Sequence, residues 1–320
     1  MDLLWPRDSG GASGKTASAD GSCRGYHHSL CRPVCRGDID SLFDLEGIGL
    51  CCGSLVQADF RGLAEAASGA GFKSISMWPT LYYDALEQGY SETDLLRILS
   101  DNNLRVTELD PYCAWLPVEV SPEDMTAAFF RYSEDDFFRM ADTLGGSSLN
   151  IIEALPSEIT AEQRIELITG LCSRAATYGL KVSIEFLPWS PIGNLTQALA
   201  LAEAVGQSNF GVNIDLWHHF RSGGTLSQLK NLAPGAIAAV QVNDIAPEPW
   251  ANVIEETSLG RILPGEGVGE TSECLSALYA SGIRGPVNVE VFSAELMGLP
   301  ALEAAQGLMA SLTYVLQSKD

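Results

Sequence analysis

Eight short apolar runs alternate with helix-like segments from residue 46 to the end of the chain. The runs, which we predict to be strands, are 47–51, 73–78, 104–109, 148–154, 182–186, 210–214, 236–242 and 286–292. Strands alternating with helices indicate a parallel sheet, and eight such units close into a (β/α)8 barrel. The alternative is a doubly wound open sheet, which more commonly carries a glycine-rich turn after its first strand. The sequence there is CCGSL, so we predict a single TIM barrel of the α/β class.

The segments between these strands show helical spacing of apolar residues. We predict helices at 59–71, 91–103, 121–144, 160–179, 195–205, 225–232, 271–281 and 295–317, with a long irregular loop ahead of 271. The helix at 91–103 opens with a capping box formed by Ser91 and Asp94. Asn194 is placed as the N-cap of the helix at 195–205, and Gly206 is placed at its end.

Residues 1–45 differ in composition from the rest of the chain. Gly, Ser, Asp and Arg dominate this stretch and no hydrophobic period is visible, which predicts a low-complexity, disordered extension. SGGASGKT at 9–16 lacks both the first glycine of a phosphate loop and a buried strand before it. The Cys and His residues of this stretch match no standard pair of zinc-binding hooks.

Net charge and cysteine use limit the partners and the compartment. The formal charge is −22, which opposes binding to nucleic acid or to an anionic membrane surface. No apolar run approaches the roughly 18–20 residues that span a bilayer. The opening MDLLWPRD lacks the features of a signal peptide, and the eight cysteines have no framework-like spacing. We therefore expect a cytoplasmic protein with reduced thiols. The sequence leaves open whether the chain forms a homo-oligomer.

Polar residues stand at the ends of the later predicted strands: Glu185, Asp215, Gln241 with Asp244, and Glu290. The carboxyl ends of the strands share one rim of such a barrel, and ligands bind there. Three of these carboxylates and the amide oxygen would form a hard, oxygen-rich set of four ligands that suits Mg²⁺, Mn²⁺ or a similar divalent ion. Crowding the carboxylates without a cation would be costly. The alternative is that some of the four residues are surface ion-pair partners.

The chain resembles the sugar-phosphate isomerase/epimerase superfamily, whose members are xylose-isomerase-like TIM barrels. The motifs are IEFLP at 184–188, NIDLWH at 213–218, VQVND at 240–244, LPGEG at 263–267 and VNVEV at 287–291. The resemblance covers about residues 46–316, and we assign 46–320 to this barrel. Many epimerases of the superfamily have His where this chain has Gln241, and Gln is similar to the dehydroshikimate/inosose dehydratase branch.

The resemblance implies roles for individual residues. One divalent ion (Mn²⁺, Mg²⁺ or Co²⁺) would be bound by Glu185, Asp215, Gln241 and Glu290. Glu185 and Glu290 would lie on opposite faces of the substrate, one removing and one returning a proton. His218 would contact the substrate or shuttle a proton, or else pack on Trp217 as an ordinary helix-start residue. Arg261 would pin a phosphate or carboxylate, or else form a surface ion pair.

Further side chains are candidates for the wall of the site. Trp78, Tyr112, Trp115 and Trp189 follow predicted strands, where they would wall a substrate pocket or simply anchor loops. Glu153 and Asp110 are placed at the same rim, where they would bind sugar hydroxyls.

The implied reaction is isomerisation or epimerisation of a small polyhydroxylated carbonyl compound, a sugar or sugar phosphate of carbohydrate metabolism. The metal would polarise the carbonyl and stabilise an enediolate while a carboxylate removes the α-proton. The alternative is a lyase that dehydrates a 3-dehydroshikimate- or inosose-like polyhydroxy ketone at the same site. A non-catalytic binding protein is a third reading, against which the intact ligand set argues.

Overall fold

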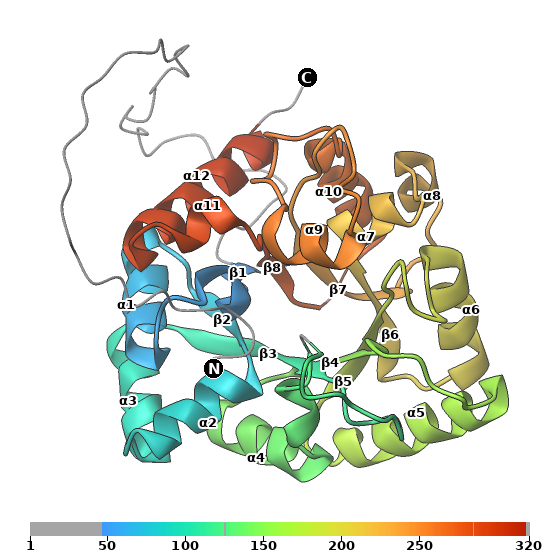
Figure 1. Ribbon diagram of the computed structural model, residues 1–320, viewed down its shortest axis with the longest axis horizontal. Helices are drawn as coiled ribbons and strands as arrows, with labels where there is room; N and C mark the ends of the chain where they lie inside the picture. The colour runs from blue at the N-terminus through green and yellow to red at the C-terminus, as the bar shows by residue number, and fades with distance from the viewer. Residues whose placement is uncertain (1–46, 125, 284, 318–320) are drawn as a thin grey trace.

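The computed structural model describes residues 47–124, 126–283 and 285–317, which form a closed barrel of eight parallel strands in chain order (Figure 1). The strands are β1 (Ile48–Leu50), β2 (Ser74–Met77), β3 (Arg105–Tyr112), β4 (Ser148–Ile152), β5 (Lys181–Glu185), β6 (Phe210–Asp215), β7 (Ile237–Val242) and β8 (Val287–Val289). The ring closes because β1 pairs with both β2 and β8. The predicted (β/α)8 barrel is therefore confirmed, whereas the predicted extension at 1–45 lies outside the described residues.

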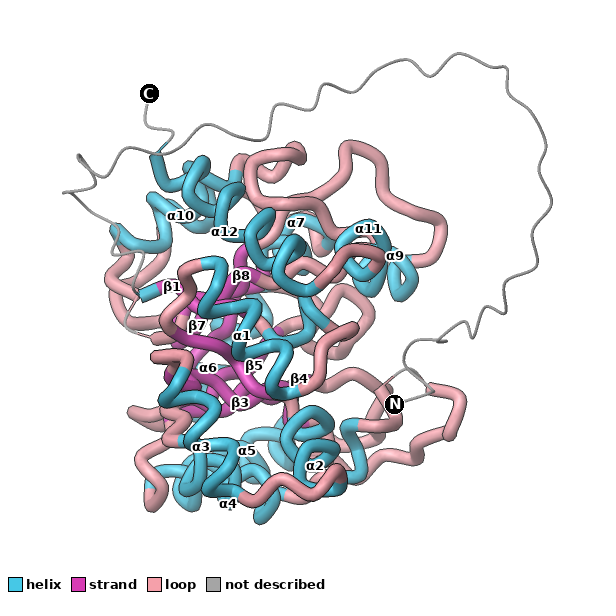
Figure 2. The backbone as a smooth tube through the Cα atoms, turned by 90° about the vertical axis from the view of Figure 1, so that its left-hand side faces the viewer, coloured by secondary structure: helices cyan, strands magenta, loops and turns pink. Residues whose placement is uncertain are grey.

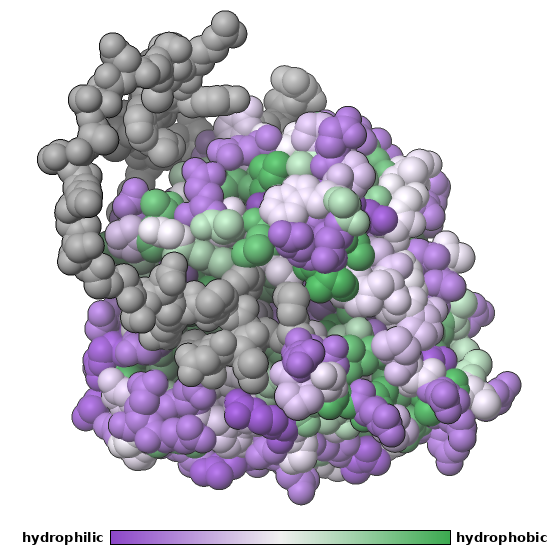
Figure 3. All heavy atoms as spheres, viewed as in Figure 1, coloured by the Kyte–Doolittle hydropathy of each residue, from purple (hydrophilic) through white to green (hydrophobic). Residues whose placement is uncertain are grey.

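Helices surround the strands, as Figures 1 and 2 show. They are α1 (Phe60–Ala70), α2 (Pro79–Glu87), α3 (Glu92–Asp101), α4 (Glu134–Leu144), α5 (Ala161–Ala176), α6 (Leu195–Val205), α7 (Leu216–Arg221), α8 (Leu226–Lys230), α9 (Val253–Leu259), α10 (Thr271–Ala280), α11 (Ala294–Met297) and α12 (Ala301–Gln317), with 3-10 turns η2 (Cys52–Leu55) and η3 (Phe129–Arg131). Among the described residues, no helix is both long and apolar enough to cross a membrane. Hydrophilic side chains are spread over much of the face in Figure 3.

Local signals at the helix ends are confirmed where the sequence carries a clear cap. Ser91 and Asp94 form the predicted capping box of α3. The Asn194 side chain accepts a hydrogen bond from the backbone N–H of Gln197, and Gly206 ends α6 in the left-handed conformation. These caps satisfy backbone groups that a helix leaves unpaired at its ends.

Three predictions of helix extent were wrong. The helix predicted at 121–144 is confined to α4, because Ser133 and Asp136 form a capping box that starts the helix there. The closing helix predicted at 295–317 is split into α11 and α12 ahead of Pro300, since a residue that precedes proline is disfavoured in the α conformation. The loop predicted to be irregular contains α9, which the side chain of Asn252 caps. The short helices α2 and α7 were not predicted.

Candidate active site

The four predicted metal ligands lie at the carboxyl ends of four consecutive strands. Glu185 ends β5, Asp215 ends β6, Gln241 is the penultimate residue of β7, and Glu290 follows β8 directly. Asp215 and Gln241 are register partners across the β6–β7 pair. All four residues are buried. The alternation of side chains along each strand turns these residues toward the inside of the barrel.

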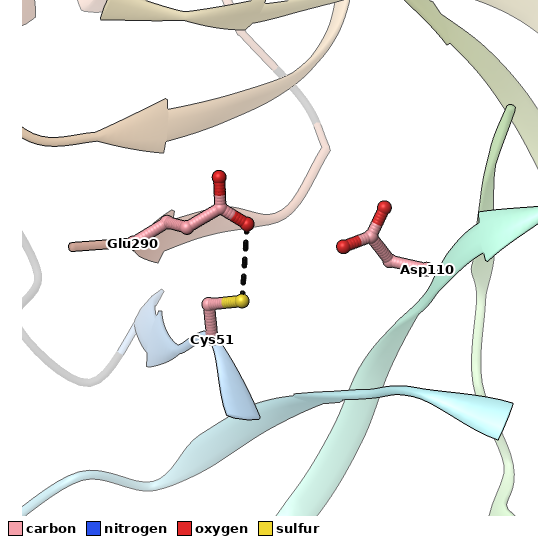
Figure 4. Close-up of side chains that lie close together, drawn as sticks. All are labelled: Cys51, Asp110 and Glu290. Atoms are coloured by element: carbon pink, nitrogen blue, oxygen red, sulfur yellow. Dashed lines mark hydrogen bonds between the residues drawn. The ribbon is translucent and has the colours of Figure 1, made fainter. Parts of the chain in front are cut away.

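Two buried clusters of potential ligand atoms divide the carboxylates between them. In each cluster of the described residues, the potential ligand atoms lie within 4.8 Å of one another. The first cluster consists of Glu185, Asp215 and His218, and the second of Cys51, Asp110 and Glu290. Figure 4 shows the second cluster, in which the Cys51 thiol donates a hydrogen bond of 3.0 Å to Oε1 of Glu290 while Asp110 approaches from β3.

Arg261 links the two clusters. Its Nη1 donates to Oδ2 of Asp215 at 2.6 Å and to Oε2 of Glu290 at 2.7 Å. The guanidinium also lies 4.4 Å from the ring centre of Phe292. Burial alone would lower the pKa of Arg261, but the surrounding carboxylates, Asp215 first, outweigh it and hold this pKa above its usual range. The predicted alternatives for Arg261 were an anion-binding residue and a surface ion pair, and in the structure it forms buried ion pairs.

His218 is the third member of the first cluster. Its Nε2 is 3.3 Å from Oε1 of Glu185, and its backbone N–H donates to Oδ1 of Asp215 at 2.9 Å. The ring meets Trp189 and Trp217 edge-on, with ring centres 5.5 and 5.1 Å away. The imidazole is thus held by aromatic packing and presents one nitrogen to the Glu185 carboxylate.

Burial and mutual repulsion shift the pKa values of the site's carboxyl groups. The pKa of Asp110 is raised to about 7, chiefly by burial and then by the charge of Glu185. Burial likewise raises the pKa of Glu290 well above its usual range, although Arg261 opposes the shift. For Asp215, burial acts in the raising direction, but Arg261 and His218 outweigh it and the pKa is lowered. Burial and neighbouring charges therefore shift the pKa values of these carboxyl groups in opposite directions, up for Asp110 and Glu290 and down for Asp215.

The donor set fits a divalent cation. Oε1 of Gln241 is buried without a hydrogen-bond partner in the structure, while its Nε2 donates to Oε1 of Glu290 at 3.0 Å. An unpartnered buried carbonyl oxygen costs free energy that a cation would offset. The carboxylates of Glu185, Asp215 and Glu290 outnumber the one guanidinium that neutralises them. Oxygens of this kind are the hard ligands that Mg²⁺, Mn²⁺ and related ions prefer, although the structure divides Glu185 and Asp215 from Glu290 between the two clusters.

A cavity of about 140 Å³ opens over these groups. Its polar lining includes Asp110, Glu185, His218, Arg261 and Glu290. Its apolar and aromatic lining consists of Trp78, Pro111, Phe129, Ile152, Ala154, Leu187, Trp189 and Phe292. A second cavity of about 320 Å³ shares Trp78 with it and has a mainly apolar lining. The first cavity is the candidate reaction pocket because it joins the carboxylates to open space.

The other predicted site residues have different surroundings. Glu153 is held by Arg164 through hydrogen bonds of 2.9 and 3.0 Å and by the Ser157 hydroxyl at 2.6 Å. Both carboxylate oxygens of Glu153 therefore already accept hydrogen bonds from neighbouring side chains. Asp244 accepts hydrogen bonds from the backbone N–H groups of Gly265 and Gly269, so it orders the LPGEG loop. Trp115 anchors a loop through a hydrogen bond to the backbone of Ile152.

Two site residues were missed by the sequence reasoning. Nδ2 of Asn150 donates to Oδ1 of Asp110 at 2.8 Å and to Oε2 of Glu185 at 2.7 Å. Cys51 directly follows β1 and meets Glu290. The rule that strand ends share one rim would have pointed to Cys51. No local signal marks Asn150, which lies inside β4.

An eight-stranded parallel barrel with buried carboxylates at the carboxyl ends of its strands has the architecture of the TIM-barrel enzymes. The chain belongs to the xylose isomerase-like TIM barrel family, whose model matches residues 64–314. This assignment confirms the resemblance recognised in the sequence.

Relatives with assigned activities share less than 30% sequence identity with this chain. The chain is 29% identical over 181 residues to the inosose isomerase of Halalkalibacterium halodurans, covering 53% of this chain and 62% of that protein. It is 26% identical over 256 residues to the 3-dehydroshikimate dehydratase of Pseudomonas aeruginosa, covering 78% of this chain and 39% of that protein. The chain therefore spans less than two thirds of the length of each of these two relatives.

Among solved structures, the fold is similar to that of the IOLI protein with a binding zinc atom. The TM-score is 0.73 at 20% sequence identity, covering 84% of this chain and 98% of that one. At this level of identity, the similarity concerns the fold.

Proposed function

We propose that this protein is a divalent-metal-dependent isomerase or epimerase of a small polyhydroxylated carbonyl compound. The observation that carries the proposal is that Glu185, His218 and Glu290 line one cavity at the carboxyl ends of the strands. Two carboxyl groups and an imidazole in one pocket are the groups needed to remove and return a proton. Similarity to inosose isomerases supports the same class of reaction.

The metal would be bound by Glu185, Asp215, Gln241 and Glu290. A divalent cation in such a site polarises a carbonyl group and stabilises negative charge on its oxygen. Asp215 is suited to hold a cation because its pKa is lowered. Arg261, which donates to both Asp215 and Glu290, would orient these two carboxylates from outside the ligand set.

The proton transfers would be carried out by the two glutamates. Glu185 comes from β5 and Glu290 from the end of β8, so the two approach the cavity from different strands. One carboxylate would remove the proton next to the carbonyl, and the other would return it. His218 Nε2, 3.3 Å from Glu185, would carry a single proton and donate it either to that carboxylate or, once the substrate is bound, to a substrate oxygen.

A dehydratase is the second candidate. The similarity to the 3-dehydroshikimate dehydratase extends over 78% of this chain, against 53% for the inosose isomerase. Gln241 at the strand-seven position also favours it. Loss of water requires a proton donor for the departing hydroxyl group, and His218 would supply that proton.

An experiment in deuterated water distinguishes the isomerase or epimerase reaction from the dehydratase reaction. Protein loaded with Mn²⁺, Mg²⁺ or Co²⁺ would be incubated with keto-sugars, inososes and 3-dehydroshikimate. An isomerase or epimerase should place deuterium at the α-carbon without a change in unsaturation, as mass spectrometry and NMR would detect. New ultraviolet absorbance with a product lighter by one water would instead establish the dehydratase. Glu290→Gln should abolish either reaction, and full activity of this variant would contradict the proposed site.

A further inference from the structure

We propose that the second cavity, beside the candidate reaction pocket, binds a small apolar compound that carries an ammonium and a carboxylate group on one carbon atom, as an apolar α-amino acid does. This binding site is additional to the reaction proposed above. Three features of the cavity support it: its apolar lining, a buried hydroxyl group without a partner at the start of α2, and one charged side chain of each sign.

The second cavity is large enough for an apolar body. Its volume is about 320 Å³, and small-molecule sites begin at roughly 300 Å³. The lining comes from η2, the first turns of α2 and the segment that leads into η3, and its apolar members include Leu55, Val56, Leu81, Val120 and Ala128. Trp78 lines both cavities, whereas none of the described residues that line this one is a proposed metal ligand. A ligand in this cavity would therefore lie outside the metal site.

A buried hydroxyl group in the cavity wall has no partner. Thr80 is the second residue of α2 and lines the cavity, with 7% of its surface exposed. Its hydroxyl forms no hydrogen bond with any described residue. The N-cap residue Trp78 supplies no side-chain hydrogen bond to the start of the helix. The first N–H groups of a helix favour an anion, so these backbone groups and the Thr80 hydroxyl together suit a carboxylate.

Two charged side chains of opposite sign belong to the same lining. Asp84 lies one turn after Thr80 on α2, and side chains with this spacing are neighbours, with Cβ atoms about 5–6 Å apart. Arg131, in η3, donates from Nε to the backbone oxygen of Ala128 at 3.3 Å and from Nη2 to the Tyr132 hydroxyl at 3.5 Å. Among the described residues, Nη1 of Arg131 has no hydrogen-bond partner, and neither Asp84 nor Arg131 forms an ion pair.

These groups match a zwitterion better than a simple acid or a simple amine. A carboxylate at the start of α2 would accept a hydrogen bond from Thr80 and attract Arg131, but Asp84 would repel it. An ammonium group on the same carbon offsets that repulsion, because it places a positive charge against Asp84. An apolar side chain would fill the rest of the cavity, where removal of its surface from water stabilises the complex.

Three probes with the same apolar body test the two charges separately. They are phenylalanine, 3-phenylpropanoate, which lacks the ammonium group, and 2-phenylethylamine, which lacks the carboxylate. Leucine is included as a smaller apolar amino acid. Titration calorimetry with the full chain would measure each affinity. We expect phenylalanine to bind about tenfold more tightly than the two compounds with a single charge, because each removes a charge-assisted hydrogen bond.

Each outcome bears on one part of the proposal. Equal affinity for 3-phenylpropanoate would overturn the ammonium group, and equal affinity for 2-phenylethylamine would overturn the carboxylate. If neither phenylalanine nor leucine shows saturable binding, the whole proposal is overturned.

Variants of the two α2 residues assign the contacts. Thr80→Val keeps the shape of the side chain and removes the hydroxyl, so it should weaken binding of phenylalanine and 3-phenylpropanoate several-fold and leave 2-phenylethylamine unchanged. Asp84→Asn should weaken phenylalanine and 2-phenylethylamine but not 3-phenylpropanoate. Glu87→Gln is the matched control, because Glu87 is an exposed acid of α2 outside the lining. Unchanged phenylalanine affinity in both Thr80→Val and Asp84→Asn protein would contradict the assignment.

Two measurements locate the ligand without reference to turnover. Ala128→Phe places a ring in the cavity, so folded protein of this variant should no longer bind phenylalanine. Removal of metal with EDTA should leave the affinity of wild-type protein unchanged, since the metal site is separate. Binding that survives Ala128→Phe, or that disappears with the metal, would show that phenylalanine binds elsewhere and would overturn the proposal. Neither result bears on the proposed isomerase or epimerase function, which hydrogen exchange into its substrate measures.

Discussion

Asn150 holds Glu185 by a hydrogen bond of 2.7 Å from its Nδ2 to the carboxylate Oε2. The same amide nitrogen donates to Asp110 at 2.8 Å, and the Ser183 hydroxyl donates to Oδ1 of Asn150 at 3.0 Å. All four side chains are buried. Asn150 is thus a positioning residue that sets the orientation of a proposed proton-transfer carboxylate from inside the barrel.

Replacing Asn150 with alanine should lower both stability and turnover. The substitution removes the Asn150 donor from two buried carboxyl oxygens, Oδ1 of Asp110 and Oε2 of Glu185, which costs about 1–3 kcal/mol for each oxygen left unpaired. Urea unfolding would measure the loss of stability, and kcat would report the misplaced Glu185. Ser183→Ala removes a hydrogen bond to Asn150 and is expected to have a smaller effect in the same direction. Wild-type kcat in folded Asn150→Ala protein would exclude the positioning role.

Asp215→Ala should remove the bound metal. Asp215 is one of four proposed ligands, and its loss leaves an incomplete set of donors. Elemental analysis of protein purified without chelator should find close to one divalent ion per wild-type chain and much less in the variant. Glu153→Gln is the matched control, because Glu153 is also a buried strand-end carboxyl but is paired with Arg164. Full metal content in Asp215→Ala protein would contradict the assignment.

Chelation should destabilise the wild-type protein. The ligands are assembled only in the folded barrel, so bound metal stabilises it by mass action, by about 2.7 kcal/mol at a hundredfold excess over Kd. Thermal unfolding with and without EDTA should show a lower Tm in EDTA, restored by excess Mn²⁺. The Tm of the Asp215→Ala variant should not respond to EDTA. A wild-type Tm that is indifferent to both EDTA and Mn²⁺ would argue against a resident metal.

Glu92 should contribute to acid sensitivity. Hydrogen bonds from Arg139, at 2.8 Å, and from the Tyr82 hydroxyl, at 2.9 Å, lower the pKa of Glu92. A lowered folded-state pKa gives stability that is present above the unfolded pKa, about 4.3, and lost as pH falls through the folded value. Glu92→Gln should therefore reduce the difference in unfolding free energy between pH 7 and pH 3 by less than about 1 kcal/mol, since the pair is partly exposed. A larger pH 7 to pH 3 difference in unfolding free energy for Glu92→Gln than for the wild type would contradict this prediction.

Replacing Gly285 and Gly307 with alanine should change the stability of the protein in opposite directions. A Cβ at Gly285 would lie 1.5 Å from the backbone oxygen of Ala238, whereas a Cβ at Gly307, within α12, would meet nothing within 4 Å. Gly307→Ala should stabilise by about 0.5–1 kcal/mol because it lowers the entropy lost on helix formation. Gly285→Ala should destabilise by more than that, because neighbouring backbone must move. Chemical unfolding of both variants tests this contrast, and equal effects would contradict it.

Residues whose positions follow from local pattern could be predicted from the sequence. Glu185, Asp215, Gln241 and Glu290 were placed together because parallel strands share one rim and each residue ends or follows an apolar run. The capping box at Ser91 was predicted for a similar reason, since its hydrogen bonds span three residues. At 121–144 two local signals compete. The helical spacing of apolar residues suggested one long helix, whereas the N-cap at Ser133 starts the observed helix there.

Only the tertiary structure decided which groups meet across the barrel. Cys51 contacts Glu290 from 239 positions away, because closure of the ring brings β1 beside β8. Arg261 lies 46 positions from Asp215 and 29 from Glu290, and no periodic pattern connects them. Local spacing determined which residues reach the rim. Long-range packing determined that Arg261 forms ion pairs with Asp215 and Glu290 and that aromatic side chains line the cavity. Such contacts depend on the closed barrel and not on neighbours in the chain.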